Sequence, residues 1–241
     1  MKGTEMFAQH HSAGRQGPLR HFLAAAVLVA CASLAACTAA QPPTSAGTAP
    51  AAEPQPVPDE GGDLAAGTYI YPYFTVPLEI TVPAGWEYSA EHALFANGDT
   101  FVRFDTASRV PSDSCHWYGT LDEVGPTVED LAMALDAALS TTMSEPTPVA
   151  VSDFRGLQFD LAIEPGIELE DCDQSHVCIH SVGSGCSRYY HQSVNERETF
   201  RVLDLDGERA IMTVGQWDDV DHALMEEARE VFDSITFVSD E

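Results

Sequence analysis

Apolar and polar residues alternate along several short segments after residue 64, a pattern typical of half-buried β-strands. The clearest pair of such segments is 199–205 and 209–214, and the Asp206-Gly207 dipeptide between them favours a tight hairpin turn. Shorter segments of strand composition lie at 68–71, 78–82, 100–104, 149–151, 156–163 and 236–238. We therefore expect hairpins to connect most of the strands.

Two segments have the period of an amphipathic helix. Thr127 is placed as an N-cap, and Asp130 follows at the distance of a capping box. The apolar face of this helix is expected to contain Val128, Leu131, Leu135, Ala138 and Leu139. The second helix, about 220–234, has an apolar face made of Leu224, Ala228, Val231, Phe232 and Ile235. The order of strands and helices predicts an α+β fold, with a largely antiparallel sheet flanked by helices.

The first 36 residues are typical of a signal peptide. Basic residues precede an apolar run that is too short to span a membrane and has the length of a signal-peptide core. The run ends in the tetrapeptide 34–37, Leu-Ala-Ala-Cys, which reads as a lipobox. We expect Cys37 to become the lipidated first residue, anchored by acyl chains to the extracytoplasmic face of the cell membrane. The alternative is ordinary cleavage after Ala39 or Ala40, which releases a soluble protein.

Residues 37–63 are rich in proline, alanine and threonine and almost lack large apolar side chains. Such a segment cannot bury a core, so we expect a disordered linker that holds the following domain away from the lipid surface. Residues 64–241 are then expected to form a single globular domain.

The chain is strongly acidic, with 38 aspartate and glutamate residues against 11 lysine and arginine residues. Removing the signal peptide leaves 37 acidic residues, eight arginines and no lysine. This charge repels nucleic acids, so nucleic acid is excluded as a partner. The negative charge is explained by the solubility of an exported protein. The alternative is that it attracts cations or a basic partner. Without lysine, Schiff-base chemistry and a phosphate-binding P-loop are also excluded.

Four cysteines follow Cys37, and an even number in an exported domain indicates two disulfides. Cys178 and Cys186 are close enough in sequence to pair, and Cys115 and Cys172 would then form the second bridge. The alternative is a zinc or copper site, because His176, His180 and His191 lie among the same cysteines. The cysteine spacing matches no common zinc module, and an oxidising compartment disfavours free thiolates.

No catalytic motif is recognisable, and the sequence indicates neither an enzyme nor a cofactor. We expect a binding or accessory module of the cell envelope that contacts a partner protein or ligand through the loop region 164–197. The candidate binding residues in this region are Arg188, Tyr189, Tyr190 and Arg197. The alternative is a cell-envelope hydrolase or metal-dependent enzyme that uses the three histidines of the same loop.

Several segments together resemble exported actinobacterial lipoproteins of the LpqN type, which belong to the PsbP-like class of αβα sandwiches. These segments are 82–86, 113–115, 125–131, 170–172, 203–209 and 231–237. The resemblance implies an antiparallel sheet between helices and a bridge between Cys115 and Cys172. It implies no known enzyme activity, because proteins of this class usually serve as binding or accessory modules. The segment from Cys178 to Cys186 departs from the family pattern.

Overall fold

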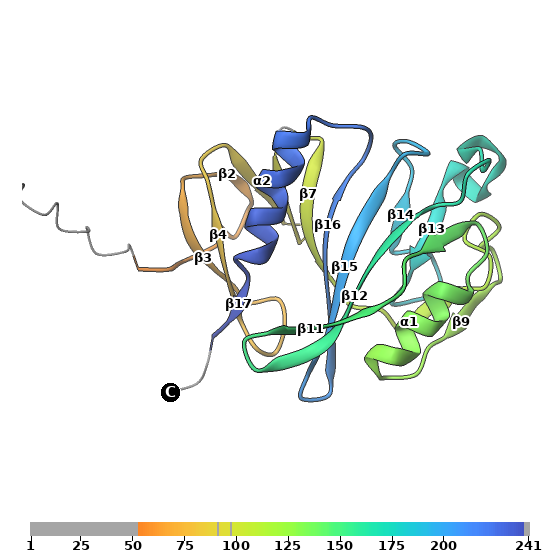
Figure 1. Ribbon diagram of the computed structural model, residues 1–241, viewed down its shortest axis with the longest axis horizontal. Coiled ribbons are helices and arrows are strands. Elements are labelled where there is room, and N and C mark those ends of the chain that lie inside the picture. Colours follow the sequence, from red (N-terminus) through yellow and green to blue (C-terminus); the bar gives the residue numbers. More distant parts are fainter. Residues whose placement is uncertain (1–52, 91, 97, 239–241) are drawn as a thin grey trace, which may run out of the picture. The chain divides into compact units, whose positions relative to one another are not determined.

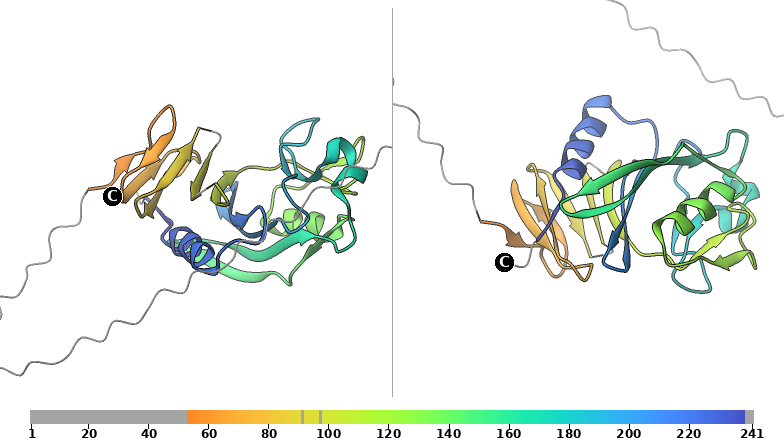
Figure 2. Two further views of the ribbon diagram at one scale, coloured as in Figure 1. Left: turned by 90° about the horizontal axis from the view of Figure 1, so that it is seen from above. Right: turned by 60° about the horizontal axis from the view of Figure 1, so that its bottom comes forward.

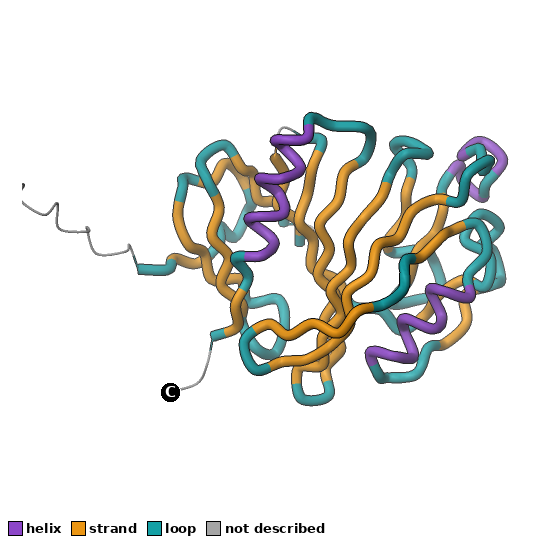
Figure 3. Tube along the Cα trace, in the orientation of Figure 1, coloured by secondary structure: helices purple, strands orange, loops and turns teal. Residues whose placement is uncertain are grey.

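A computed structural model describes residues 53–90, 92–96 and 98–238, all within one compact unit. The predicted signal peptide, Cys37 and most of the predicted linker lie outside these residues. Two α-helices and mostly antiparallel strands confirm the α+β prediction, and the single parallel pairing among the described strands joins β1 to β3. Figure 3 shows that strands fill most of the space between the two helices.

A nine-stranded antiparallel sheet forms the centre of the fold. Its order is β10 (Thr141–Met143), β12 (Phe154–Ile163), β15 (Arg197–Leu205), β16 (Glu208–Gln216), β7 (Thr100–Asp105), β6 (Ala93–Ala96), β5 (Trp86–Ser89) and β2 (Gly62–Leu64), and β11 (Thr147–Val151) also pairs with β12. The longest pair, β15 and β16, turns at Asp206-Gly207 with positive φ at both residues, as predicted.

Three smaller sheets surround this centre. One has the order β1 (Gln55–Pro56), β3 (Gly67–Tyr71), β4 (Leu78–Val82) and β17 (Thr236–Phe237). The other two are the pairs β8 (Arg109–Pro111) with β9 (Leu121–Glu123) and β13 (Val177–His180) with β14 (Arg188–Tyr190). Figure 2 shows the first strands of the described chain gathered at the end of the unit away from α1. Strand β1 lies before residue 64 and β2 ends at it, so regular structure begins before the predicted domain boundary.

Two hydrophobic cores form on opposite faces of the central sheet. Along β15, Phe200 and Val202 belong to one core and Leu203 and Leu205 to the other, as the alternation of a strand requires. Helix α2 (His222–Asp233) lies against β4, β7 and β16 in one core (Figure 1). Helix α1 (Val128–Ala137) lies against β8, β10, β12 and β15 in the other. Two 3-10 turns, η1 (Leu169–Asp171) and η2 (Asp173–Ser175), border this second core.

Helix α1 begins with the predicted capping box. The Thr127 hydroxyl accepts the Asp130 backbone N–H at 3.1 Å, and the Asp130 carboxylate accepts the Thr127 backbone N–H at 3.1 Å. The prediction of an apolar face reaching Leu139 was wrong, because the helix ends at Ala137 and the Leu139 side chain is 63% exposed.

The cap gives a direct test of local helix stability. Thr127→Ala removes the capping oxygen and is expected to lower the free energy of unfolding by about 1 kcal/mol. Thr127→Ser keeps an oxygen at the same position and serves as the control. Chemical denaturation of both variants measures the difference, and equal losses for alanine and serine would contradict the role of the hydroxyl.

Candidate functional site

Strand β15 changes from apolar to polar residues on the face that α2 partly covers. Leu205 and Leu203 lie in the core beneath α2, whereas Arg201, Thr199 and Arg197 continue the same face toward the start of the strand. The helix lies mainly over β4, β7 and β16, so this end of β15 and the adjacent part of β12 are left open. The open polar surface next to α2 is the candidate functional site (the helix and strand are labelled in Figure 1).

Strand pairing arranges the floor of this surface in three rows. Each row crosses β12, β15 and β16 through residues that are directly opposite one another, so their side chains share a face. The rows are Gln158, Arg201 and Met212; Asp160, Thr199 and Val214; and Ala162, Arg197 and Gln216.

The floor and the helix enclose a hollow of about 420 Å³, with Met225 and Arg229 of α2 on one side and Thr142 and Ser144 on the other. A neighbouring hollow of about 220 Å³ shares Asp160, Thr199, Val214 and Arg229 with it and extends to Arg201, Phe232 and Asp233. The two hollows form one continuous feature, which we call the α2 groove. The first hollow alone has the volume of a small-molecule site.

Three arginines line the α2 groove, each held differently. Arg201 is 8% exposed, donates to Asp233 Oδ1 at 2.8 Å and lies over the Phe232 ring at 4.2 Å. The exposed Arg197 donates to Asp219 Oδ1 at 3.1 Å. Arg229 is exposed and forms no hydrogen bond or ion pair with any described residue. Its guanidinium is available to a ligand.

Hydroxyl groups of the groove are also oriented by hydrogen bonds. Thr199 Oγ1 donates to Asp160 Oδ1 at 2.6 Å, and Ser144 Oγ accepts the Asp160 backbone N–H at 2.9 Å. The second oxygen of Asp160 and the hydroxyl proton of Ser144 are left for other partners. The groove thus combines guanidinium donors with a carboxylate, hydroxyls and amides, a donor and acceptor set suited to binding a polar ligand.

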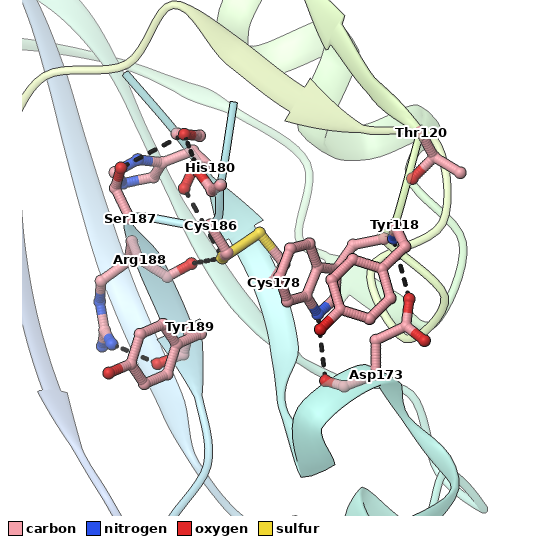
Figure 4. Close-up of a disulfide and its surroundings, with 12 residues drawn as sticks. Tyr118, Thr120, Asp173, Cys178, His180, Cys186, Ser187, Arg188 and Tyr189 are labelled. Atoms are coloured by element: carbon pink, nitrogen blue, oxygen red, sulfur yellow. Dashed lines mark hydrogen bonds between the residues drawn. A yellow bond between two sulfur atoms is a disulfide. The ribbon is translucent and has the colours of Figure 1, made fainter. Parts of the chain in front are cut away.

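The four cysteines form two disulfides, as predicted. Cys115 pairs with Cys172, and Cys178 pairs with Cys186 across the β13–β14 hairpin. Figure 4 shows the second bridge joining β13 to the segment that leads into β14, with the Arg188 guanidinium bonded to the Tyr189 carbonyl oxygen at 2.6 Å. The first bridge attaches the segment before α1 to the 3-10 turns, so both bridges stabilise the layer that covers the α1 side of the sheet.

The predicted binding residues of loop 164–197 do not form one surface. Arg188 and Tyr190 are 5% and 0% exposed and point toward the central sheet, so they are not surface ligand contacts. The prediction that they lie on an exposed loop was wrong, because residues 188–190 form strand β14 and alternate residues face opposite sides. Tyr189 lies on the outer side, and Arg197 belongs to the α2 groove.

Arg188 is the centre of a buried ion cluster beneath the β13–β14 hairpin. Its guanidinium contacts the carboxylate of Glu198 and lies 3.6 Å from that of Glu196, and both glutamates are fully or almost fully buried. The same guanidinium lies 5.3 Å from the Phe101 ring centroid and 5.2 Å from that of Tyr190. Such an arrangement explains why two carboxylates are accommodated inside an acidic protein.

The three histidines of the predicted metal site are not brought together. His176 and His191 contact each other and Tyr189 in one cluster of rings, with the two imidazole centroids 5.4 Å apart, but His180 is not part of it. His180 is fully buried, and neither ring nitrogen has a hydrogen-bond partner among the described residues. Within those residues no three His, Cys, Asp or Glu side chains are grouped to hold a metal ion. The geometry therefore gives no support to the metal alternative.

Burial moves two pKa values in opposite directions near this cluster. Loss of hydration raises the pKa of Glu196 to about 7, against the opposing effects of Arg188 and of the backbone N–H groups of His191 and Gln192. Loss of hydration also lowers the pKa of His180 to about 4. The folded state thus binds a proton more readily than the unfolded chain at Glu196 and less readily at His180.

These shifts predict opposite pH effects in two variants. Protonated Glu196 stabilises the fold below its unfolded pKa, and this stabilisation is lost as the pH rises through 7. The free energy of unfolding of Glu196→Gln should therefore increase relative to that of the wild type between pH 4.5 and 7. The wild type loses stability as the pH falls from 6.5 toward 4, because the unfolded chain protonates His180 more readily than the folded state does. The free energy of unfolding of His180→Gln should therefore increase relative to that of the wild type over the same range. Denaturation at a series of pH values measures both differences, and parallel pH profiles for the variants and the wild type would contradict both shifts.

The α2 groove was missed at the level of sequence, although one signal for it is present. Reading every second residue of β15 from Leu205 gives two leucines followed by Arg201, Thr199 and Arg197, which marks where helix coverage of the sheet stops. The same alternation assigns Glu198 and Phe200 to the opposite face.

Comparisons with known proteins leave the function to be argued from geometry. No protein-family model, curated protein or solved structure matches the chain. Within residues 53–90, 92–96 and 98–238, no helix is long and apolar enough to span a membrane. The α2 groove is accordingly the feature on which a functional proposal depends.

Proposed function

We propose that this protein is a non-enzymatic binding module of the cell envelope, tethered by lipid at Cys37, that binds its ligand in the α2 groove. The observation that carries the proposal is the groove itself. An open part of the sheet carries arginines, hydroxyls and a carboxylate where a core would have apolar side chains. A continuous hollow of this size, lined by both polar and apolar side chains, supports the proposal of a preformed binding site.

The location of the module rests on three features. The lipobox ends at Cys37, and a linker separates it from the domain. Two disulfides supply the cross-links expected of a protein that folds in an oxidising compartment. The lipid would hold the domain at the extracytoplasmic face of the membrane.

The relation to PsbP-like αβα sandwiches is also part of the proposal. Support comes from α1 and α2 packing in cores on opposite faces of one antiparallel sheet. The Cys115–Cys172 bridge agrees with what the resemblance implies. The β13–β14 hairpin and its own disulfide would then be an addition to the common framework.

Lipid anchoring is tested by expressing the full-length chain in a bacterium that processes lipoproteins. The N-terminal peptide of the membrane-extracted protein should carry a diacylglyceryl group on Cys37, detected by mass spectrometry. Cys37→Ala should abolish the modification and leave the domain unanchored. An unmodified N-terminus beyond Ala39 in the wild type would overturn the anchoring.

Binding in the groove is tested with variants that fill it. Ala162 lies in the floor of the groove, and Ala162→Trp would occupy the hollow, whereas Arg155→Trp places the same ring at an exposed position on the opposite face. Native mass spectrometry of protein released from its own membranes should detect a retained ligand in the wild type and in Arg155→Trp. A ligand retained equally by Ala162→Trp, or absent from all three proteins, would contradict the proposed function.

A further inference from the structure

The arginines of the exported chain are unevenly distributed. Three of the eight arginines after Cys37 line the α2 groove, although acidic residues outnumber arginines more than fourfold in that part of the chain. Most of the others are committed elsewhere: Arg103 to Asp105, Arg109 to Glu123, Arg188 to the buried glutamates and Arg209 to backbone carbonyls. The groove therefore holds the main concentration of positive side chains among the described residues.

The three groove arginines divide into one that is fixed and two that are available. Arg201 is buried and held by Gln158 and Asp233, so its charge is already paired within the groove. Arg197 has an exposed ion pair with Asp219, a type of pair that contributes little and exchanges easily. Arg229 has no partner among the described residues. Arg197 and Arg229 both line the larger hollow.

A cluster of arginines of this kind has a specific use in a protein so acidic. The overall charge repels anions at long range, so an anionic ligand is retained only where guanidinium groups supply short, charge-assisted hydrogen bonds. Arginine presents several N–H donors in one plane and matches the two oxygens of a carboxylate or phosphate group. A neutral ligand would not require three arginines at one groove.

The remaining lining specifies the body of the ligand. Thr142, Ser144, Thr199 and Gln216 provide donors and acceptors, and Asp160 accepts hydrogen bonds, as the hydroxyl groups of a sugar require. Ala162, which is half-buried in the floor of the groove, supplies apolar surface on which the carbon face of a sugar ring can lie. The volume of about 420 Å³ accommodates a ligand of this size.

We propose that the α2 groove is a binding site for an acidic sugar, a hydroxyl-rich ring that carries a carboxylate or phosphate group. Arg197 and Arg229 bind the anionic oxygens, and Asp160 and Thr199 face the hydroxyl groups. This inference rests on the proposed binding function and specifies its ligand class.

Three probes with the same six-membered pyranose ring separate the possibilities: glucuronic acid carries a carboxylate, glucose 6-phosphate carries a phosphate, and glucose carries neither. Each is titrated into the disulfide-bonded protein while NMR follows the side-chain Nε–H signals of the arginines. Either acidic sugar should shift the signals of Arg197 and Arg229, and glucose should not. Binding of only one acid would assign the anionic group, and binding of both would assign the general class.

Two variants test the residues. Arg229→Gln and Arg197→Gln should each weaken binding of the acidic sugar about tenfold, the effect of losing a hydrogen bond to a charged group. Arg155→Gln removes an exposed arginine from the opposite face of β12 and should leave the affinity unchanged. Arg197 and Arg229 are both exposed, so these substitutions should not impair folding.

Several results would overturn the acidic-sugar site. These are glucose binding as tightly as the acids, inorganic phosphate producing the same shifts at the same concentrations as glucose 6-phosphate, unchanged affinity in both groove variants, or no binding of either acid. A neutral ligand retained in the groove by the membrane-derived protein would overturn the acidic-sugar site alone. Loss of groove occupancy altogether would instead contradict the proposed function.

Discussion

Arg188→Ala is expected to lower the free energy of unfolding by about 3–5 kcal/mol. The variant leaves the Glu196 and Glu198 carboxylates buried beneath the β13–β14 hairpin without their cation. It also removes the guanidinium that lies over the rings of Phe101 and Tyr190. Urea denaturation monitored by tryptophan fluorescence measures the loss.

Arg197→Ala provides the matched control, because it also removes an arginine from an ion pair with an acidic residue, but at the surface. Its effect should stay within about 0.5 kcal/mol of zero. Replacing the cluster as a whole, by Arg188→Met with Glu196→Gln and Glu198→Gln, should recover most of the stability lost in Arg188→Ala. Similar losses for Arg188→Ala and Arg197→Ala would show that burial of the charges does not determine the cost.

Removing the Cys115–Cys172 bridge by replacing both cysteines with alanine should cost about 4 kcal/mol. The bridge spans 57 residues and restricts the unfolded chain accordingly. It also holds the 3-10 turns against the segment that leads into α1. Denaturation of the exported, oxidised variant measures the effect.

The Cys178–Cys186 bridge is the internal comparison, since it spans only eight residues. Its double alanine variant should lose about 2.5 kcal/mol, less than the longer bridge, because closing a short loop removes less freedom from the unfolded chain. A larger loss for the short bridge would indicate that its main contribution is to hold the β13–β14 hairpin over the ion cluster.

Much of the central fold was predictable because its signals are local. The Asp-Gly turn, the alternation of β15 and β16 and the capping box at Thr127 each determine a conformation within about ten residues. The predicted helix at 220–234 corresponds to α2, which has the Asp221 side chain as its N-cap. The expected hairpin connections between neighbouring strands predicted an antiparallel sheet, and the central sheet is antiparallel.

The smaller sheets could not be predicted in the same way. Strands β8, β9, β13 and β14 are three or four residues long, and their pairing depends on disulfides and on contacts between distant segments. Strands β1 and β2 fall within the proline-rich segment, where composition alone indicates a linker. These two strands form because β1 pairs with β3 and β2 pairs with β5. No local sequence pattern reveals such pairings.

The candidate site was only partly accessible from the sequence. Arg197 was identified as a binding residue, but it was grouped with Arg188 because the two are close in the chain. The structure separates them, since Arg188 contacts the buried glutamates and Arg197 lies in the α2 groove with residues of β12, β16 and α2. Recognising the groove required the register that sets Arg197 beside Ala162 and Gln216.

The alternation of β15 also makes the module straightforward to re-engineer. Residues 197, 199 and 201 contact the groove, whereas 198, 200 and 202 belong to the buried interior on the other face. A library randomised at the exposed position 197 and the half-buried position 199 would therefore sample new ligand preferences on a scaffold that keeps the buried Arg201. Deleting a single residue within this stretch would do the opposite, because every later side chain would exchange faces and the groove and the interior would be lost together.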